Sequence, residues 1–273
     1  MNERETAPRW KPSPLLLASC AVHLGAAAAL IVRPRAWPWG LGALLANHMA
    51  LAAAGLWPRS QLLGPNWTRL PARGLERAVA ITIDDGPDPE VTPRVLALLE
   101  GHGASATFFC IGERVLRYPD LAQEVVRRGH AIENHSQRHR HNFSLLGPSA
   151  MNAEVASAQE SIFRTTGSMP RFFRAPAGLR NPFLDPVLVR LKLQLASWTR
   201  RGFDTVSADA DAVFRRLASP LEDGDILLLH DGHAARTPAG RPVILEVLPR
   251  LLETLSARQL KSVTLRSALP GHA

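Results

Sequence analysis

The stretch Ala78-Val79-Ala80-Ile81-Thr82-Ile83-Asp84-Asp85-Gly86-Pro87 decides the fold. Its first six residues are apolar or β-branched, which is typical of a parallel strand that is buried on both faces. The Gly-Pro pair then interrupts the strand. Two carboxylates at the end of such a strand are costly to bury unless they bind a cation or take part in acid–base chemistry. The end of this strand is therefore the predicted active site.

Composition limits the partners of the chain. Its 273 residues, 46% of them hydrophobic, suffice for one large domain with an appendage. The net charge is +8, and residues 1–70 contribute +5 of it, close to the apolar N-terminal segments. This distribution indicates anionic membrane lipid as a partner. The sequence has no basic helix, aromatic stacking platform or zinc-knuckle spacing, so nucleic-acid binding is not expected.

Two apolar stretches near the N-terminus, residues 14–32 and 39–57, predict a transmembrane helical hairpin. Each is about long enough to cross a hydrocarbon core of ~30 Å at ~1.5 Å per residue. Tryptophans near their ends suit the membrane interface. We expect residues 1–60 to anchor the protein in the cell (inner) membrane, and residues 61–76 to form a linker to the catalytic domain.

Two other interpretations of these stretches stay open. The first stretch could be a cleaved signal peptide, since Arg9 and Lys11 precede it and small residues at 26–28 offer a cleavage site. Both stretches could instead be soluble alanine-rich helices. The count of flanking basic residues favours a hairpin with both termini in the cytoplasm, but the side that holds the catalytic domain is left open.

Strands and helices alternate from residue 77 onward, so residues 77–273 are expected to be an α/β domain with parallel strands. After the first strand, we expect strands at 105–111, 130–133, 171–173, 192–198, 225–229 and 262–265. We expect helices at 89–101, 118–129, 148–167, 182–191, 208–217 and 242–258.

Polar residues with catalytic potential follow these predicted strands. In a (β/α) barrel such positions converge on the C-terminal face, where catalytic groups collect. The candidates are Asp84, Asp85, His135, His139, Arg174, Asp204 and His230.

The spacing of His135 and His139 allows both to bind one metal ion if their loop turns helically. One added carboxylate completes a His₂-carboxylate site. Zn²⁺ in such a site lowers the pKa of bound water from about 15.7 to about 7. A second carboxylate can then serve as the base. His141 is an alternative ligand, whereas His233 receives no role.

Four motifs resemble those of a known family, the polysaccharide deacetylases with the NodB homology domain (carbohydrate esterase family four). The chain is similar to the family's T-F-D-D-G-P, H-[ST]-x-x-H, R-x-P-x-G and L-x-L-H at residues 82–87, 135–139, 174–178 and 227–230. Residues 106–109 also match its A-T-F-F strand. The resemblance covers residues 77–265 and implies a distorted (β/α) barrel of the NodB type.

The resemblance also implies roles at one half of the site. Asp84 would be the base that takes a proton from the attacking water. Asp85, His135 and His139 would hold a divalent metal ion, with Zn²⁺ the first choice. Arg174 would pair with Asp84, which keeps that carboxylate ionised and oriented.

At the other half of the site, the resemblance implies that the N–H of Ala177 forms part of an oxyanion hole and that His230 protonates the departing amine. Asp204 would hold the imidazolium form of His230. This sequence keeps only the second Asp of the family's D-x-x-D-W motif, so Asp204 could also be a turn residue. Ala177 replaces the usual Tyr, and Arg140 stands where Pro often follows the second metal-binding His.

The sequence therefore predicts a metal-dependent hydrolase that removes an N-acyl group from an amino sugar in a polysaccharide or glycoconjugate. The expected acyl group is acetyl. A first alternative keeps this chemistry but acts on a lipid-linked amino sugar as a deacylase or deformylase. A second alternative is a membrane-anchored carbohydrate-binding protein with an inactive site. The expected partners are a carbohydrate or glycolipid substrate and membrane lipid.

Overall fold

A parallel sheet is the centre of the domain after residue 76. The computed structural model describes residues 9–72 and 76–269, and in these ranges every paired strand is parallel to its neighbour. The order across the sheet is β5-β4-β3-β2-β1-β7-β6, and β8 pairs with the start of β1. The strands are β1 (Ala78–Gly86), β2 (Ala106–Cys110), β3 (Ala131–Asn134), β4 (Phe172–Phe173), β5 (Gln194–Leu195), β6 (Arg200–Arg201), β7 (Ile226–His230) and β8 (Lys261–Ser262).

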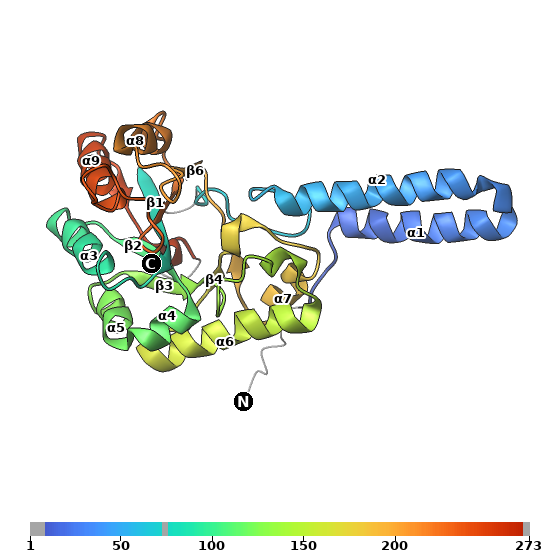
Figure 1. Cartoon of the computed structure of the whole chain (residues 1–273), viewed down its shortest axis with the longest axis horizontal. Helices are drawn as coiled ribbons and strands as arrows, with labels where there is room; N and C mark the ends of the chain where they lie inside the picture. The colour runs from blue at the N-terminus through green and yellow to red at the C-terminus, as the bar shows by residue number, and fades with distance from the viewer. Residues whose placement is uncertain (1–8, 73–75, 270–273) are drawn as a thin grey trace.

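Helices cover the outer face of this curled sheet, which confirms the α/β class and the parallel strands (Figure 1). The α-helices are α1 (Pro14–Val32), α2 (Trp37–Leu56), α3 (Thr92–Gly101), α4 (Gly112–Arg117), α5 (Pro119–Arg127), α6 (Pro148–Thr166), α7 (Leu184–Arg190), α8 (Ala210–Ala218) and α9 (Ile244–Ala257). Four short 3₁₀ turns complete the described elements: η1 (Pro34–Ala36), η2 (Phe143–Leu145), η3 (Pro176–Gly178) and η4 (Leu265–Ala268).

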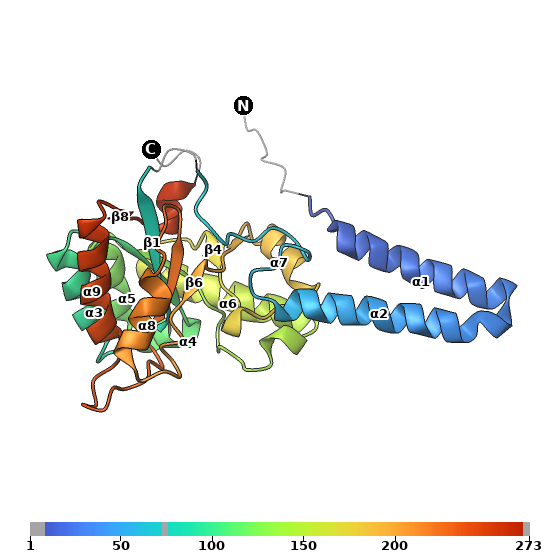
Figure 2. The ribbon, with the colours of Figure 1, turned by 90° about the horizontal axis from the view of Figure 1, so that it is seen from above.

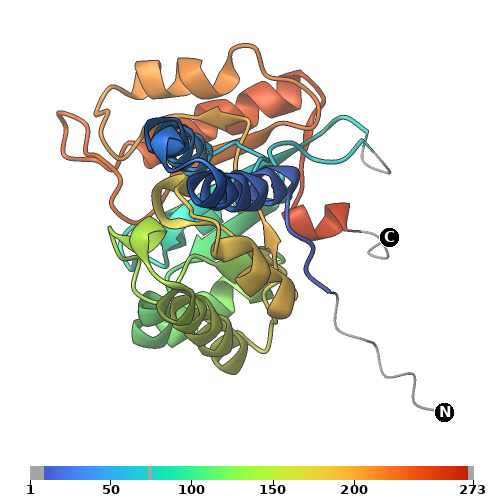
Figure 3. The same ribbon diagram turned by 90° about the vertical axis from the view of Figure 1, so that its right-hand side faces the viewer.

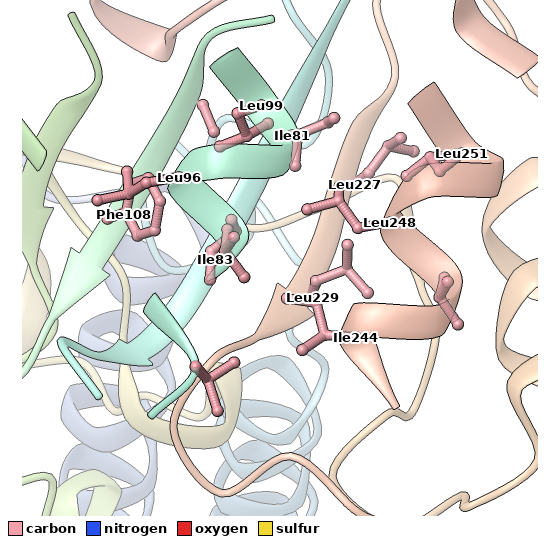
Figure 4. Packing of buried hydrophobic residues seen from close by; sticks show 14 of the residues in the cluster. Ile81, Ile83, Leu96, Leu99, Phe108, Leu227, Leu229, Ile244, Leu248 and Leu251 are labelled. Carbon is pink, nitrogen blue, oxygen red and sulfur yellow. The ribbon is translucent and has the colours of Figure 1, made fainter. Parts of the chain in front are cut away.

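Side-chain alternation along β1 separates the core from the site. Ile81 and Ile83 point outward against Leu96 and Leu99 of α3 and against α9 (Figure 4). Residues two apart on a strand lie on the same face, so Ala80, Thr82 and Asp84 all face the inside of the curl. Burying the outward Ile and Leu side chains stabilises the fold by about 1.5–3 kcal/mol each. This packing on the outer face of the sheet holds the strand that carries the two carboxylates in place.

The sheet is an open half-barrel. Its two edge strands are β5 and β6, and no strand pairing joins them in the described residues. Part of the expected linker 61–76 packs across this side. The N–H of Trp67 donates to the carbonyl of Leu195, and the N–H of Leu70 donates to the carbonyl of Gly224. Leu63 and Leu70 are also buried. The segment expected to be a linker therefore contacts the domain through these backbone hydrogen bonds and buried side chains.

Short edge elements differ most from the sequence predictions. The predicted strand at 192–198 is ladder-paired only at β5, because its neighbour β4 has just two residues. The strand expected at 262–265 is replaced by β8 and the turn η4, and the sequence predicted neither α4 nor β6. Residues 73–75 and 270–273, which belong to the expected linker and catalytic domain, lie outside the described ranges, as do residues 1–8.

The helices α1 and α2 form an antiparallel hairpin that extends away from the domain (Figures 1 and 2). The helix α1 has the predicted bounds, and α2 starts two residues earlier than expected. The amide of Asn47 donates to the Ser19 hydroxyl at 3.0 Å between them. Both helices are long and apolar enough to cross a membrane, and only 11% and 17% of their apolar windows are buried. These helices are therefore not core helices.

Figure 3 shows the hairpin end-on in front of the domain, and contacts at its base join it to the domain. The N–H of Arg180 donates to the carbonyl of Gly55 at 3.1 Å. A Cβ at Gly55 would lie 2.2 Å from the Arg180 carbonyl oxygen, so only glycine allows this approach. The indole N–H of Trp10 donates to the carboxylate of Asp185 at 2.7 Å. The hairpin thus meets the domain beside the turn η3.

Candidate functional site

The two carboxylates of β1 separate where the strand leaves its regular pairing. The β1–β2 register shifts between Asp84 and Gly86, and Asp85 has a φ of 74°. A left-handed backbone at a non-glycine residue is strained, and such strain concentrates at functional sites. Because the strand is distorted here, the side chains of Asp84 and Asp85 reach different neighbours. Both are almost fully buried.

Arg174 holds Asp84 from inside the sheet. Its Nη1 donates to Asp84 Oδ1 and to Thr82 Oγ1, each at 2.7 Å, while Nη2 donates to the Ser197 carbonyl. The guanidinium is fully buried and stands 4.1 Å above the ring of Phe109. Burial lowers the pKa of Arg174, and the Asp84 charge partly offsets this effect. The pair leaves Asp84 Oδ2 free of Arg174 and 3.7 Å from His135 Nε2.

Two imidazoles face the other carboxylate. The Nε2 atoms of His135 and His139 lie 3.3 and 3.2 Å from Asp85 Oδ1. His135 Nδ1 is 2.8 Å from the Arg174 carbonyl, which can only accept a hydrogen bond. In the neutral ring the proton is therefore on Nδ1, and Nε2 presents its lone pair to the site.

The loop that carries these histidines is not helical, in contrast to the condition set from their spacing. Ser136 and His139 have positive φ angles of 66° and 50°, and the N–H of His139 donates to the Ser136 hydroxyl. This tight turn brings the two rings to a centroid separation of 4.8 Å. The two histidines therefore do lie together, as their four-residue spacing predicted. Residues with positive φ angles bring them together, and not a helical turn.

These residues fit a divalent metal ion. One ligand atom from each of Asp85, His135 and His139 can be chosen so that all lie within 4.8 Å of one another. Asp85 Oδ1 is buried with no hydrogen-bond partner among the described residues. An unpaired buried carboxylate oxygen is costly unless a cation satisfies it. Two imidazoles and one carboxylate are a ligand set typical of open zinc sites.

Protonation at the site also suits a cation. Burial raises the pKa of Asp85, but the nearby imidazoles, those of His135 and His233 first, outweigh it and hold that pKa well below the usual value. Burial and the His135 charge lower the pKa of His139 to about 4. Burial lowers the pKa of His135, while the charges of Asp84 and Asp85 more than restore it. Asp85 is thus ionised and His139 neutral near pH 7.

A second acid–base pair comes from β7 and the loop after β6. Asp204 accepts from the His230 backbone N–H at 2.7 Å and lies 2.8 Å from His230 Nδ1. Burial lowers the pKa of His230, but the Asp204 charge and hydrogen bond raise it to about 9. Asp204 is fully buried in the turn after β6, and both of its carboxylate oxygens contact His230.

A cavity of about 230 Å³ connects the two halves of the site. Ala177 and Gly178 of η3 form part of its wall, and Ala177 has a φ of 54°. All the predicted site residues except Arg174 and Asp204 line the cavity, and these two contact lining residues from behind. The cavity is lined by Asp84, Asp85, His135, His139, His141, Ala177, Gly178, Trp198, Arg201, Thr205, Leu228, His230 and His233.

Sequence reasoning missed several cavity residues. His233 Nδ1 lies 3.2 Å from Asp85 Oδ2, although no role was assigned to it. Its position three residues after His230, beyond a glycine, was the available signal. Trp198 lies just after the short strand β5, and Arg201 belongs to the two-residue strand β6, which the sequence did not predict. Asp231 is buried behind the site, where burial raises its pKa to about 7 and Thr92 donates to it.

Known proteins resemble this chain in sequence. The Polysaccharide deacetylase family profile matches residues 72–196. A peptidoglycan-N-acetylglucosamine deacetylase of Bacillus cereus is 32% identical over 196 residues, which cover 71% of this chain and 89% of that protein. A chitooligosaccharide deacetylase of Bradyrhizobium sp. is 33% identical over 158 residues, 58% of this chain and 72% of that protein.

Solved structures agree with the sequence relatives. A family 4 carbohydrate esterase from Streptomyces lividans, in complex with acetate, is 31% identical and superposes with a TM-score of 0.62 over 69% of this chain and 93% of that one. A peptidoglycan N-acetylglucosamine deacetylase superposes with a TM-score of 0.67 at 25% identity, over 75% and 92%. This chain therefore belongs to the polysaccharide deacetylase family, whose members are hydrolases of carbon–nitrogen bonds other than peptide bonds.

Proposed function

We propose that this protein removes an N-acyl group from an amino sugar in a polysaccharide. The first candidate for this group is acetyl. The observation that carries the proposal is the buried, unpartnered Asp85 oxygen facing His135 and His139. Asp84 stands next to it, and His230 lines the same cavity. The relatives named for deacetylation of peptidoglycan and chitooligosaccharides support an N-acetylglucosamine-containing glycan as the substrate.

Asp85, His135 and His139 would hold the divalent cation, with zinc as the first candidate. When bound, such a cation polarises a carbonyl oxygen and lowers the pKa of water. The proton transfers and the positioning of the substrate are carried out by residues of the protein. Arg174 fixes one oxygen of Asp84, so the other can accept the proton of the attacking water. The wall at Ala177 and Gly178 limits where the acyl carbonyl can lie.

His230 supplies the second proton transfer. Its pKa of about 9 keeps the imidazolium form populated at neutral pH, and Asp204 fixes the ring. As a carbon–oxygen bond forms from water and the carbon–nitrogen bond breaks, the nitrogen needs a proton to leave as an amine. In this proposal His230 gives that proton. The products are acetate and the free amino sugar.

Acetate release tests this proposal. The purified full chain should release acetate from N-acetylglucosamine oligomers, lose this activity in a chelator, and regain it when zinc is added. His135→Ala should lose metal and activity together, whereas His141→Ala should keep both. If neither soluble nor lipid-linked amino sugars release an acyl group at any metal concentration, the inactive carbohydrate-binding alternative replaces the enzyme proposal. If release persists without metal, the proposed metal dependence is wrong.

We also propose that the α1–α2 hairpin anchors the protein in the cell membrane. Leu24, Ile31 and Val32 of α1 and Met49 of α2 are exposed on its surface, which suits lipid better than water. The Asn47–Ser19 hydrogen bond joins the helices, as polar residues do between membrane helices. A signal peptide cleaved after α1 would remove this partner from α2.

One contact supports the lipid-linked alternative as a second candidate function. The last turn of α2 accepts a hydrogen bond from Arg180, two residues after η3, and a Cβ on Gly178 of η3 would lie 2.8 Å from Pro58. With α2 in a bilayer, the cavity wall would be next to the membrane surface. An amino sugar carried on a membrane lipid would then be within reach. Comparing acetate or formate release from lipid-linked and soluble sugars tests this alternative.

A further inference from the structure

Arg201 is an arginine without an acidic partner at the wall of the catalytic cavity. Its Nε is buried and has no hydrogen-bond partner, and none of the described ion pairs includes it. Two nearby arginines differ from it. Arg174 is paired with Asp84, and Arg200, its chain neighbour, is paired with Asp225 at 2.7 Å. A half-buried guanidinium that faces a cavity without a counter-ion is a candidate for binding an anion.

Two aromatic rings hold this guanidinium in place. Its central carbon lies 5.4 Å from the centroid of Trp198 and 4.9 Å from that of Phe203. Phe203 has a φ of 61° and is 45% exposed. A bulky residue in this conformation is strained. The stacking orients the planar group without neutralising it, because aromatic faces attract a cation but accept no strong hydrogen bond.

The register places Arg201 on the same face as the proposed acid. Arg201 pairs with Leu228 in the parallel β6–β7 ladder, and Leu228 lines the cavity. His230 follows two residues later on the same face of β7. Two residues of a strand span about 7 Å. A group bound by Arg201 would therefore be on the reacting sugar or on its immediate neighbour.

We propose that Arg201 binds an anionic substituent, a phosphate or a carboxylate, of the amino-sugar substrate. Guanidinium groups bind these two groups through two parallel N–H···O bonds, which gives both energy and orientation. The proposal rests on the proposed deacylase function and narrows its substrate class: this enzyme prefers an acylated amino sugar that carries a negative charge beside the acyl group. The charge could belong to a sugar carboxylate or to a phosphate that links the sugar to a lipid.

Matched substrates test the proposal with the full chain and its metal. The neutral member is an N-acetylglucosamine oligomer, and the charged members carry a carboxylate or a phosphate on the reacting sugar or its neighbour. The wild-type protein should show a higher kcat/KM on a charged member. Arg201→Gln should lower the charged-to-neutral ratio of kcat/KM by roughly 10- to 100-fold, the scale of a charge-assisted hydrogen bond. Arg201→Lys should keep part of the preference.

The controls separate this inference from the proposed function. Arg164→Gln removes the same charge from the exposed face of α6 and should leave the ratio unchanged. Soluble sugar phosphates compared with the same phosphate on a lipid in vesicles distinguish the two sources of phosphate. If no substrate turns over, calorimetry with the same sugars still measures the charged-to-neutral affinity ratio. An equal ratio in the wild-type protein and Arg201→Gln, by rate or by binding, overturns the inference.

Discussion

Different partners surround the two neighbouring carboxylates at the end of β1, and this difference predicts different losses. Asp84 is bound by Arg174, whereas Asp85 faces His135 and His139. Asp84→Asn should keep metal bound while turnover falls by about 10²- to 10⁴-fold, the usual contribution of a general base. Asp85→Asn should lose metal, with activity partly restored by excess zinc. Metal content and turnover number measured on the same samples check both outcomes.

The stability of these variants must be measured alongside. Asp84→Asn leaves the buried Arg174 without a charged partner, and an unpaired buried charge is strongly destabilising. A lower unfolding temperature is therefore expected for Asp84→Asn even when its metal is retained. Loss of metal in Asp84→Asn, with metal and rate both kept in Asp85→Asn, would show that the two roles are reversed.

The Asp204–His230 pair predicts a shift in the pH profile. The pKa of His230 is raised to about 9, so the pair stabilises the fold fully below about pH 6.5 and loses this contribution as pH rises through about 9. The rate should fall over the same upper range, because the acid form of His230 disappears. Asp204→Asn removes the charge that raises this pKa and should move the basic limb to lower pH.

Profiles of kcat/KM between pH 5 and pH 10 measure this limb. Asp211→Asn makes the same substitution on the exposed surface of α8 and should leave the limb in place. A limb that stays in Asp204→Asn would mean that another group controls it.

At the scale of elements, the hairpin carries a prediction about membrane attachment. The full chain should stay in the membrane fraction after an alkaline carbonate wash, because two apolar helices of spanning length with exposed surfaces hold it there. A chain that begins at Trp57 keeps the buried Leu63 and Leu70 and should be soluble and active. Release of the full chain by the wash alone would contradict a spanning anchor.

Element types were predictable where the pattern was long, and not where it was short. The helix α1 was predictable because its sequence is apolar along its whole length, and the six helices expected in the domain because their apolar residues recur at helical spacing. The strands β5 and β6 have two residues each, too few to show any alternation. Their existence depends on neighbours such as Trp67, which bridges to Ala196 from a distant part of the chain.

The same distinction explains which parts of the site could be predicted. Asp84, Asp85 and His230 end long apolar strands, so their place at one edge of the sheet follows from the sequence. Arg201 and His233 become visible only when the sheet curls and brings β6, β7 and their loops around one cavity. The packing of Leu63 and Leu70 against the domain likewise depends on distant contacts, which is why the segment resembled a linker.

At the scale of the whole molecule, the close contact between Gly55 and Arg180 joins the hairpin directly to the catalytic domain. An enzyme on a flexible tether searches a volume, but one docked at the end of its own anchor works at one fixed height. With α2 in a bilayer as proposed, the cavity would stay at a constant distance from the membrane surface while the protein diffuses laterally. It would therefore reach only a thin layer of glycan parallel to that surface. A long glycan would then lose acyl groups only where it passes through that layer, and the pattern of free amines would record the distance of each sugar from the membrane.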